Sequence, residues 1–411
     1  MEFLYNIFVS LLIFGMKIGA IFNYKLKKGL AGRRQSCEIV QHAFSPTDKV
    51  IWMHAASLGE YEQGLPVLEK LKGNFPDHKI LITFFSPSGY ENVIKKKHIA
   101  NAICYLPFDR KKDVKEFVSA FNTKIFFTVK YDYWYNLLNE LRNKGTKIYV
   151  VSALFYETQV FFKPYGKWFV RRLDKNIDWF FHQTKHSTAL AKSLGLKNSS
   201  TAGDTRFDRV KKLRNLDNFV EFIDDFKQNQ QTIVFGSSWE TDEKLAEVIF
   251  TKNKTVKLII APHDLKRVAN LKAIFPEAIL YSELQIIPKT DFSNRQVLII
   301  DCIGLLSKLY NYADIAIVGG GFHSKGLHNI LEAATFGKPV FFGNHYLKNP
   351  EADELIERKG GKSFEDEYFA GPYILGLLKN LENLEEMGNN ARNFIDEQPN
   401  ASEIIVRKIL S

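Results

Sequence analysis

The stretch VIWMHAASLGEYEQG, residues 50–64, places a polar turn between an apolar run and the start of a helix. Residues 50–53 are typical of a buried strand, and leucines then recur at helical spacing over residues 65–71. Ser57 and Glu60 have the spacing of a capping box, in which a hydroxyl and a carboxylate satisfy free N–H groups at a helix start. The stretch therefore predicts a strand, a turn and a helix, and it leaves Glu60 two roles, helix cap or proton acceptor.

The same alternation of apolar runs and amphipathic segments continues along the chain, which is typical of parallel sheets covered by helices. In the first half, strands are expected at residues 50–54, 79–85, 101–106, 124–129, 147–153 and 178–183. A polar stretch at 205–230 is expected to contain one connecting helix. In the second half, strands are expected at residues 232–237, 256–263, 296–301, 314–321 and 338–343. The pattern predicts an α/β chain of two doubly wound, Rossmann-like domains facing across a cleft.

Four segments are expected on this basis. They are an anchor helix with a basic segment at 1–35, a first domain at 36–210, a connector at 211–231, and a second domain with terminal helices at 232–411. The net charge of +10 over 411 residues indicates an anionic partner, such as a phosphorylated substrate or a membrane surface. No nucleic-acid-binding motif is present, so a nucleic acid partner is not expected.

The N-terminal residues 3–22 contain a single charge, Lys17. Twenty helical residues span about 30 Å, which is enough to cross the apolar core of a bilayer. Asn6, Ser10 and Lys17 fall within about 40° of one another on such a helix, so a helix lying in the membrane interface is equally compatible. The basic residues at 25–34 place the rest of the chain on the cytoplasmic side if the helix spans.

Polar clusters follow several expected strands, where open parallel sheets bind their ligands. Glu60 holds this position in the first half. In the second half, His263 could stack on a base, and Ile303 and Gly304 could offer backbone groups to a base edge. Plain turns explain these residues equally well.

The glycine-rich turn GGGFHSKGLHN, residues 319–329, leads into an expected helix near Asn329. Glycines allow close approach to an anion, and His323 and Lys325 would add positive charge. Glu332 could accept hydrogen bonds from ribose hydroxyls, although Asn329 and Glu332 also fit a helix cap. No metal-ligand spacing is present, so neither a metal nor another cofactor is expected.

At these residues the chain resembles a known family, the 3-deoxy-D-manno-octulosonic acid (Kdo) transferases of lipopolysaccharide assembly. The most specific segments are WMHAASLGE (52–60) and HNILEAATFGKPVFFGNHYLKNPEA (328–352), with GDTRFD (203–208) and the pair at 262–263 in support. The resemblance implies the GT-B architecture. It also implies an inverting, metal-independent transfer of Kdo from CMP-Kdo to a lipid A precursor, at the cytoplasmic side of the cell inner membrane.

Carried over by position, the family's general base falls on Glu60. The CMP contacts fall on Pro262, His263, Ile303, Gly304, Leu305, Asn329, Ile330, Leu331 and Glu332. The first half would then bind the lipid acceptor and the second half the nucleotide.

Several positions depart from the usual family pattern. Leu305 stands where an acid is common, and Lys130 stands where an acid precedes a Trp-Pro pair. Tyr135 replaces that proline, and residues 152–154 replace an Asn-Ala-Arg. Acceptor details and the number of Kdo units therefore do not follow from the resemblance. Two alternatives stay open: a membrane-associated GT-B enzyme that uses a UDP-sugar, and a membrane-docked binding protein without catalytic activity.

Overall fold

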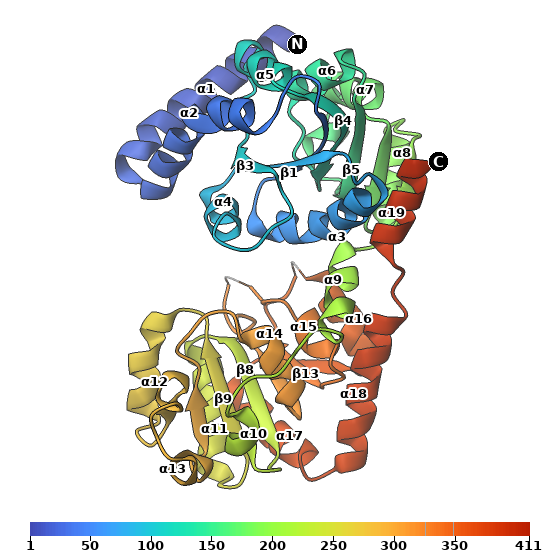
Figure 1. The fold of residues 1–411 in the computed structure, drawn as a ribbon. Coiled ribbons are helices and arrows are strands. Elements are labelled where there is room, and N and C mark those ends of the chain that lie inside the picture. The colour runs from blue at the N-terminus through green and yellow to red at the C-terminus, as the bar shows by residue number, and fades with distance from the viewer. Residues whose placement is uncertain (325, 348) are drawn as a thin grey trace. The chain divides into compact units, whose positions relative to one another are not determined.

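The computed structural model describes residues 1–324, 326–347 and 349–411 and divides the chain into two compact units. The first unit comprises Met1–Arg209 with Pro399–Ser411, and the second comprises Val210–Gln398. Each unit is built on a seven-stranded sheet whose neighbouring strands are all parallel (Figure 1). The two doubly wound sheets predicted from the sequence are confirmed.

The first sheet has the strand order β3-β2-β1-β4-β5-β6-β7. Its strands are β1 (Lys49–Ala55), β2 (Lys79–Phe84), β3 (Ala102–Tyr105), β4 (Asn122–Val129), β5 (Lys147–Ala153), β6 (Trp179–His182) and β7 (Ser199–Thr201). The helices of this unit are α1 (Glu2–Phe22), α2 (Tyr24–Ala43), α3 (Leu58–Asn74), α4 (Pro87–Val93), α5 (Lys111–Ser119), α6 (Tyr135–Asn143), α7 (Lys167–Asn176), α8 (Lys185–Ser193), α9 (Thr205–Leu213) and α19 (Ala401–Leu410). The break between the units falls within α9.

The second sheet has the order β10-β11-β9-β8-β12-β13-β14. Its strands are β8 (Thr232–Ser238), β9 (Lys257–Pro262), β10 (Ile279–Leu280), β11 (Val297–Ile299), β12 (Ile315–Val318), β13 (Val340–Gly343) and β14 (Gly361–Phe364). The helices are α10 (Ile223–Lys227), α11 (Glu240–Lys252), α12 (Val268–Ile274), α13 (Lys289–Ser293), α14 (Leu306–Leu309), α15 (Leu331–Ala334), α16 (Pro350–Glu357), α17 (Glu367–Leu377) and α18 (Leu381–Asp396). All expected strands are present, and the short strands β7, β10 and β14 were not expected.

The central strand β1 shows why the apolar runs are continuous. Val50 and Trp52 pack with α2, α5 and α6 on one face of the sheet. Ile51 and Met53 pack with α3 and α4 on the other face. Because both faces are covered, every position of the strand after its first residue is buried, as a parallel sheet requires.

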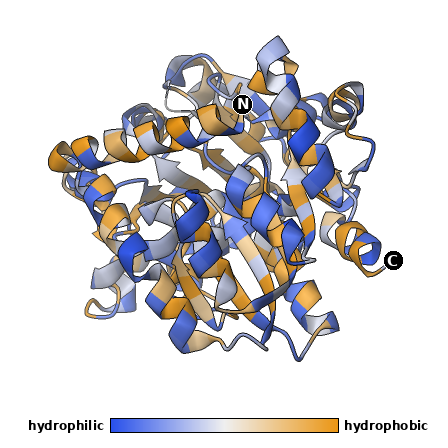
Figure 2. Ribbon diagram, turned by 90° about the horizontal axis from the view of Figure 1, so that it is seen from above, coloured by the Kyte–Doolittle hydropathy of each residue, from blue (hydrophilic) through white to orange (hydrophobic). Residues whose placement is uncertain are grey.

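The N-terminal helix α1 is docked on the first unit through its polar side chains. The hydroxyl of Tyr5 donates to Oδ2 of Asp109 (2.6 Å), and Nδ2 of Asn136 donates to Oδ1 of Asn6 (2.9 Å). The opposite face of α1 exposes a row of large apolar side chains, among them Phe8. Figure 2 shows long hydrophobic stretches on this helix, which starts at the N label. By length and composition α1 could cross a membrane.

The segment boundaries differ from the expected ones in the first unit. The basic segment after α1 is itself the helix α2, which continues to Ala43 because Ser36 and Val40 are buried on the same face as Arg33. The expected boundary at residue 35 therefore falls inside a helix.

The last helix, α19, belongs to the first unit, whereas the sequence prediction placed all of 232–411 in the second. Asp208 accepts hydrogen bonds from the backbone N–H groups of Ala401 and Ser402 (both 3.1 Å). Ile405 and Val406 complete the core that contains α3. Periodicity predicts such a helix, but it does not indicate which of two cores the helix completes.

The connecting stretch 205–230 holds two helices, α9 and α10, instead of the one expected. The side-chain amide of Asn218 donates to the carbonyls of Leu213 (2.8 Å) and Leu216 (3.1 Å). The first of these hydrogen bonds satisfies a carbonyl at the end of α9.

Candidate active site

Each sheet has one point at which its strand order reverses, and ligands of open α/β sheets bind beyond the strand ends at that point. In the first sheet the chain moves outward from β1 to β2 and β3 and then resumes at β4 on the other side of β1. Glu60 follows β1, and Lys130 and Asp132 follow β4. These residues therefore meet at the expected binding edge.

Glu60 lies in the first turn of α3. One of its carboxylate oxygens takes part in capping the helix, and the other is available to a ligand. Its Oε2 accepts a hydrogen bond from the N–H of Ala56 (2.5 Å), and its own N–H donates to Oγ of Ser57 (3.4 Å). Among the described residues, Oε1 of Glu60 has no hydrogen-bond partner, and the side chain is half-buried. The carboxylate can therefore cap the helix and accept a proton at the same time.

The electrostatic surroundings of Glu60 raise its pKa. Burial is the largest cause, because it disfavours the ionised carboxylate, and the negative charge of Asp132 acts in the same direction. The N–H of Ala56 and the positive charge of Lys130 lower the pKa and partly offset this shift. A carboxylate with a raised pKa is a stronger base, which suits it to general-base chemistry.

A buried hydrogen-bond chain holds Asp132 beside Glu60. Nε1 of Trp52 donates to Oγ1 of Thr83 (2.8 Å), and that hydroxyl lies 2.9 Å from Nδ1 of His54. Nε2 of His54 lies 2.6 Å from Oδ2 of Asp132. If the Thr83 hydroxyl donates to Nδ1, the Nε2–H group of His54 donates to Asp132, and each group in the chain is satisfied.

Strained backbone also marks these strand ends. Lys130 has φ of 64° and Ser152 has φ of 54° in the first unit, and Ser237 has φ of 53° in the second. Non-glycine residues adopt the left-handed region at an energetic cost, and such residues cluster at functional sites. All three lie at or just after the carboxyl end of a central strand.

The second sheet reverses between β8 and β12, and aromatic rings converge at that point. The ring of His263, just after β9, stacks on Trp239 at a centroid distance of 4.6 Å and on His328 at 4.5 Å. Nε1 of Trp239 donates to Nε2 of His328 (3.1 Å). Burial lowers the pKa of His328 to about 4, with a further contribution from His263, so His328 is neutral near pH 7. These rings form a platform with the shape and polarity to stack a nucleobase.

Two acidic residues of α11 support this platform. Oδ2 of Asp242 accepts from the N–H of Trp239 (2.8 Å) and from that of Gly320 (3.3 Å), which ties the end of β8 to the glycine-rich turn. Burial raises the pKa of Asp242 to about 6. The adjacent Glu243 is fully buried and accepts two hydrogen bonds from Arg267, at 2.8 and 2.6 Å.

The predicted nucleotide contacts lie on the same edge of the second unit. Oδ1 of Asn329 accepts from the N–H of Leu331 (3.1 Å), and its Nδ2 donates to Oε1 of Glu332 (3.2 Å). Asn329 therefore caps the short helix α15, which begins at Leu331. Glu332 and Asn329 are half-buried, whereas Ile330 and Leu331 are fully buried. Leu331 and Ile330 can then offer backbone groups to a ligand, but not side chains.

The remaining predicted contacts are more open. Pro262 ends β9 and is half-buried, and His263 is exposed apart from its stacked rings. Ile303 is 89% exposed, and Gly304, with φ of 103°, is exposed beside the half-buried Leu305. Lys325 lies outside the described residues.

The glycines of the turn after β12 serve protein packing. A Cβ at Gly321 would lie 2.6 Å from the backbone N of Gly343, and one at Gly319 would lie 2.2 Å from the carbonyl oxygen of Ser237. The sequence led us to expect that these glycines let an anion approach the backbone. At Gly319 and Gly321 they instead let two segments of the protein's own backbone approach each other.

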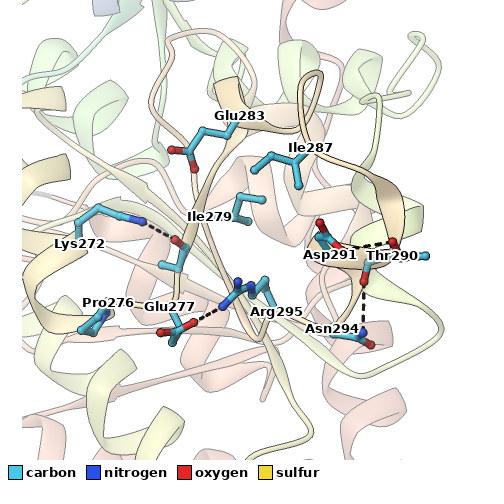
Figure 3. Close-up of a pocket in the computed structure, with 11 residues that line it drawn as sticks. Lys272, Pro276, Glu277, Ile279, Glu283, Ile287, Thr290, Asp291, Asn294 and Arg295 are labelled. Carbon is cyan, nitrogen blue, oxygen red and sulfur yellow. Dashed lines mark hydrogen bonds and ion pairs between the residues drawn. The ribbon is translucent and has the colours of Figure 1, made fainter.

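A separate cavity of about 650 Å³ lies in the second unit beside α12, β10 and α13 (Figure 3). None of the predicted contacts lines it. Its polar side chains are engaged with protein: Lys272 donates to the carbonyl of Ala278 (2.6 Å), Arg295 pairs with Glu277, and Nδ2 of Asn294 donates to the carbonyl of Thr290 (3.2 Å). The cavity is therefore separate from the predicted nucleotide contacts.

Comparison with solved structures defines the fold. UDP-GlcNAc 2-epimerase from Neisseria meningitidis, solved bound to UDP-GlcNAc, superposes with a TM-score of 0.61 at 16% identity, covering 88% of this chain and 99% of that one. Acinetobacter baumannii MurG gives a TM-score of 0.55 at 13% identity, with 88% and 99% coverage. The two parallel sheets and these neighbours define the GT-B fold.

Comparison of sequences finds similarity to one family of transferases. Residues 30–209 match the family described as 3-Deoxy-D-manno-octulosonic-acid transferase (kdotransferase). The chain is 28% identical over 317 residues to the 3-deoxy-D-manno-octulosonic acid transferase of Aquifex aeolicus, covering 75% of this chain and 80% of that protein. It is 25% identical over 365 residues to that of Chlamydia trachomatis serovar D, covering 86% and 83%.

One relative is much longer than this chain, which matches only part of it. The bifunctional glycosyltransferase/methyltransferase of Fusobacterium nucleatum is 27% identical over 375 residues, which are 88% of this chain but 57% of that protein. Taken with the fold, these relatives define the class of this protein, a glycosyltransferase. More narrowly, residues 30–209 match the Kdo transferase family, and the chain is similar to Kdo transferases over 75% and 86% of its length.

Proposed function

We propose that this protein transfers Kdo from CMP-Kdo to a lipid A precursor and inverts the anomeric centre. Glu60 would remove the proton of the acceptor hydroxyl as its oxygen attacks the anomeric carbon, and CMP would leave. The observation that carries this proposal is the Glu60 carboxylate, which has a raised pKa and an available oxygen at the switch point of the first sheet.

The nucleotide would bind to the second unit. The ring platform of Trp239, His263 and His328 would stack cytosine, and Glu332 would accept hydrogen bonds from ribose hydroxyls; the stacked rings and the position of Glu332 beside Asn329 support this assignment. The charge of the leaving CMP would be met by backbone N–H groups and basic side chains, without a metal. The relatives are named as Kdo transferases, which supports Kdo as the transferred sugar.

We also propose that the protein works at the cytoplasmic side of the inner membrane. The exposed apolar face of α1 supports membrane attachment, and the basic residues of α2 suit an anionic surface. The polar contacts of Tyr5 and Asn6 support a helix that lies along the first unit in the membrane interface, and not one that leaves the unit to span the bilayer.

The test is mass spectrometry of the lipid formed from CMP-Kdo and a lipid A precursor. The expected product is heavier by whole Kdo units, and the same spectrum gives their number. In parallel, thermal-shift titration with CMP, UMP and UDP identifies the donor class, since the cognate nucleotide stabilises by mass action. Stabilisation by UDP alone would support the UDP-sugar alternative, and no stabilisation by any of them would support a binding protein.

A further inference from the structure

The first unit contains a second cavity that the candidate active site does not use. It measures about 370 Å³ and lies among α1, α2 and the segment from the end of β3 into α5. We call it the α1–α2 pocket. Ile13, Leu30 and Phe108 provide apolar walls. Lys17, Arg33, Arg34 and Arg110 give it four cationic side chains against two carboxylates, one of which, Asp113, already pairs with Arg110 at 2.6 Å.

Arg33 is the unusual member of this pocket. It is 7% exposed, and no carboxylate of the described residues lies within ion-pair distance of it. Its guanidinium donates to the carbonyls of Gly29 (3.0 Å) and Phe85 (2.5 Å) and lies over the rings of Phe85 and Phe108, at 4.4 and 5.0 Å. Nε of Arg33 is buried and has no partner in the described part of the chain. A buried cation without an acid is costly, so a functional role is the natural explanation.

Arg33 stays charged at neutral pH. Burial lowers its pKa only to about 10, and the negative charge of Asp132 opposes that shift. Asp132 also acts on Glu60. Asp132 therefore interacts electrostatically with both Arg33 and Glu60.

The surroundings of the pocket point to a lipid and not to a soluble anion. Lys17 lies on α1 beside Phe14 and Ile18, which are 62% and 46% exposed, and the helix ends with Ile21 and Phe22 at 75% and 87%. A cationic pocket bordered by exposed apolar side chains matches a ligand with a charged head and apolar chains.

We propose that the α1–α2 pocket binds the phosphate of an acylated, anionic headgroup whose acyl chains lie along the exposed face of α1. Lys17 and Arg34, which are exposed, would donate charge-assisted hydrogen bonds to the phosphate, and Arg33 would supply fixed positive charge behind them. The headgroup belongs either to the acceptor or to a bilayer lipid. The acceptor form rests on the proposed function, and the bilayer form does not.

The experiment compares two double variants of the full-length protein. Lys17→Ala with Arg34→Ala removes the exposed cations of the pocket. Lys25→Ala with Lys27→Ala removes two exposed cations of α2 that do not line it. The first arm measures binding to phosphatidylcholine vesicles with and without phosphatidylglycerol at low and high salt. The second measures initial rates of Kdo transfer to a phosphorylated lipid A precursor and to the same lipid after phosphatase treatment.

At high salt the control variant should match the wild type, because salt screens the long-range attraction that Lys25 and Lys27 contribute without contacting the headgroup. The pocket variant should still lose about tenfold or more, as expected for charge-assisted hydrogen bonds. Loss of binding to phosphatidylglycerol vesicles supports a bilayer lipid. Loss of kcat/KM for the phosphorylated acceptor alone, absent for the dephosphorylated one, supports the acceptor. Equal behaviour of the two variants in both arms overturns the proposal. Absence of Kdo transfer by the wild type would refute the proposed function, while the vesicle arm would still decide on the pocket.

Discussion

Nε2 of His54 lies 2.6 Å from Oδ2 of Asp132, although 78 positions separate the two residues in the chain. The contact exists because β1 and β4 are adjacent in the sheet, with His54 paired to Thr128 in parallel register. His54 is fully buried and is itself held by Thr83. The Asp132 charge is thereby fixed where it raises the pKa of Glu60.

Removal of that charge should change the pH dependence of the reaction. In Asp132→Asn the amide oxygen can still accept from His54, but the like charge near Glu60 is gone. The pKa of Glu60 should fall, so the base stays ionised to lower pH. The acid limb of the kcat/KM profile should therefore move to lower pH. If the acid limb of the kcat/KM profile does not move, that limb does not reflect the ionisation of Glu60.

Lys130→Gln removes a positive charge near Glu60, whereas Asp132→Asn removes a negative one. The positive charge of Lys130 lowers the pKa of Glu60, so its removal should raise that pKa and move the acid limb to higher pH. The two variants alter neighbouring positions of one loop, yet they should shift the profile in opposite directions. A shift of the same sign in both would indicate a general disturbance of the loop.

Glu60→Gln tests the base directly. The glutamine carbonyl can still accept from the N–H of Ala56, so the helix start should be kept. Turnover should fall by about 10²–10⁴-fold, the usual contribution of a positioned general base. The measurements are transfer rate and thermal unfolding, with Glu62→Gln on the same helix as the control. Full turnover with a normal fold would make Glu60 a cap and nothing more.

The sequence predicted the position of Glu60 at the strand ends of the first sheet. It did not predict which residues from other strands lie near the predicted site residues. Glu60 was found because the strand, the turn and the helix around it are adjacent in the chain. Asp132 and His54 were missed because no local pattern indicates that β4 pairs with β1. Trp239 and His328 were missed for the same reason: their contacts with His263 depend on the order of β8, β9 and β12. The burial of Arg33 likewise depends on how α2 packs.

Glu332 and Asn329 should separate nucleotide binding from helix capping. Asn329, and not Glu332, accepts the N–H of Leu331. Asn329→Ala should therefore destabilise the protein by ~1 kcal/mol, as the loss of a cap does. Glu332→Gln should leave stability nearly unchanged and weaken CMP binding, measured by calorimetry. Equal CMP affinity in the wild type and Glu332→Gln would contradict the ribose assignment.

Asp242 should make the stability of the protein depend on pH. Burial raises its pKa from 3.8 to about 6, so its contribution to stability is fully present below pH 3.8 and is lost as the pH rises through 6. Asn at this position carries no such dependence. Between pH 4 and 7 the stability of Asp242→Asn relative to the wild type should rise by up to about 3 kcal/mol, from a shift of roughly two pKa units. Thermal unfolding measures this difference, and a difference that stays constant between pH 4 and 7 would contradict the raised pKa of Asp242.

The outward face of α1 should carry membrane attachment. Deletion of the helix would uncover Asp109, which is buried beneath Tyr5, so substitution is the cleaner change. Phe8, Leu11 and Phe14 are 57%, 63% and 62% exposed, and their replacement by Gln should leave the fold intact. Burial of each in lipid is worth roughly 1.5–3 kcal/mol, so the triple variant should bind vesicles at least about a hundredfold more weakly.

The control for that variant has the same number of substitutions at matched exposure. Leu216, Phe219 and Leu381 are 60%, 61% and 66% exposed in the second unit, and their replacement by Gln should leave vesicle binding unchanged. Flotation at high salt is the appropriate measurement, because it removes the contribution of the basic residues of α2. CMP binding should be the same in the α1 variant and the wild type, since the nucleotide contacts lie in the second unit. If the two triple variants float equally well at high salt, the exposed face of α1 is not the membrane contact.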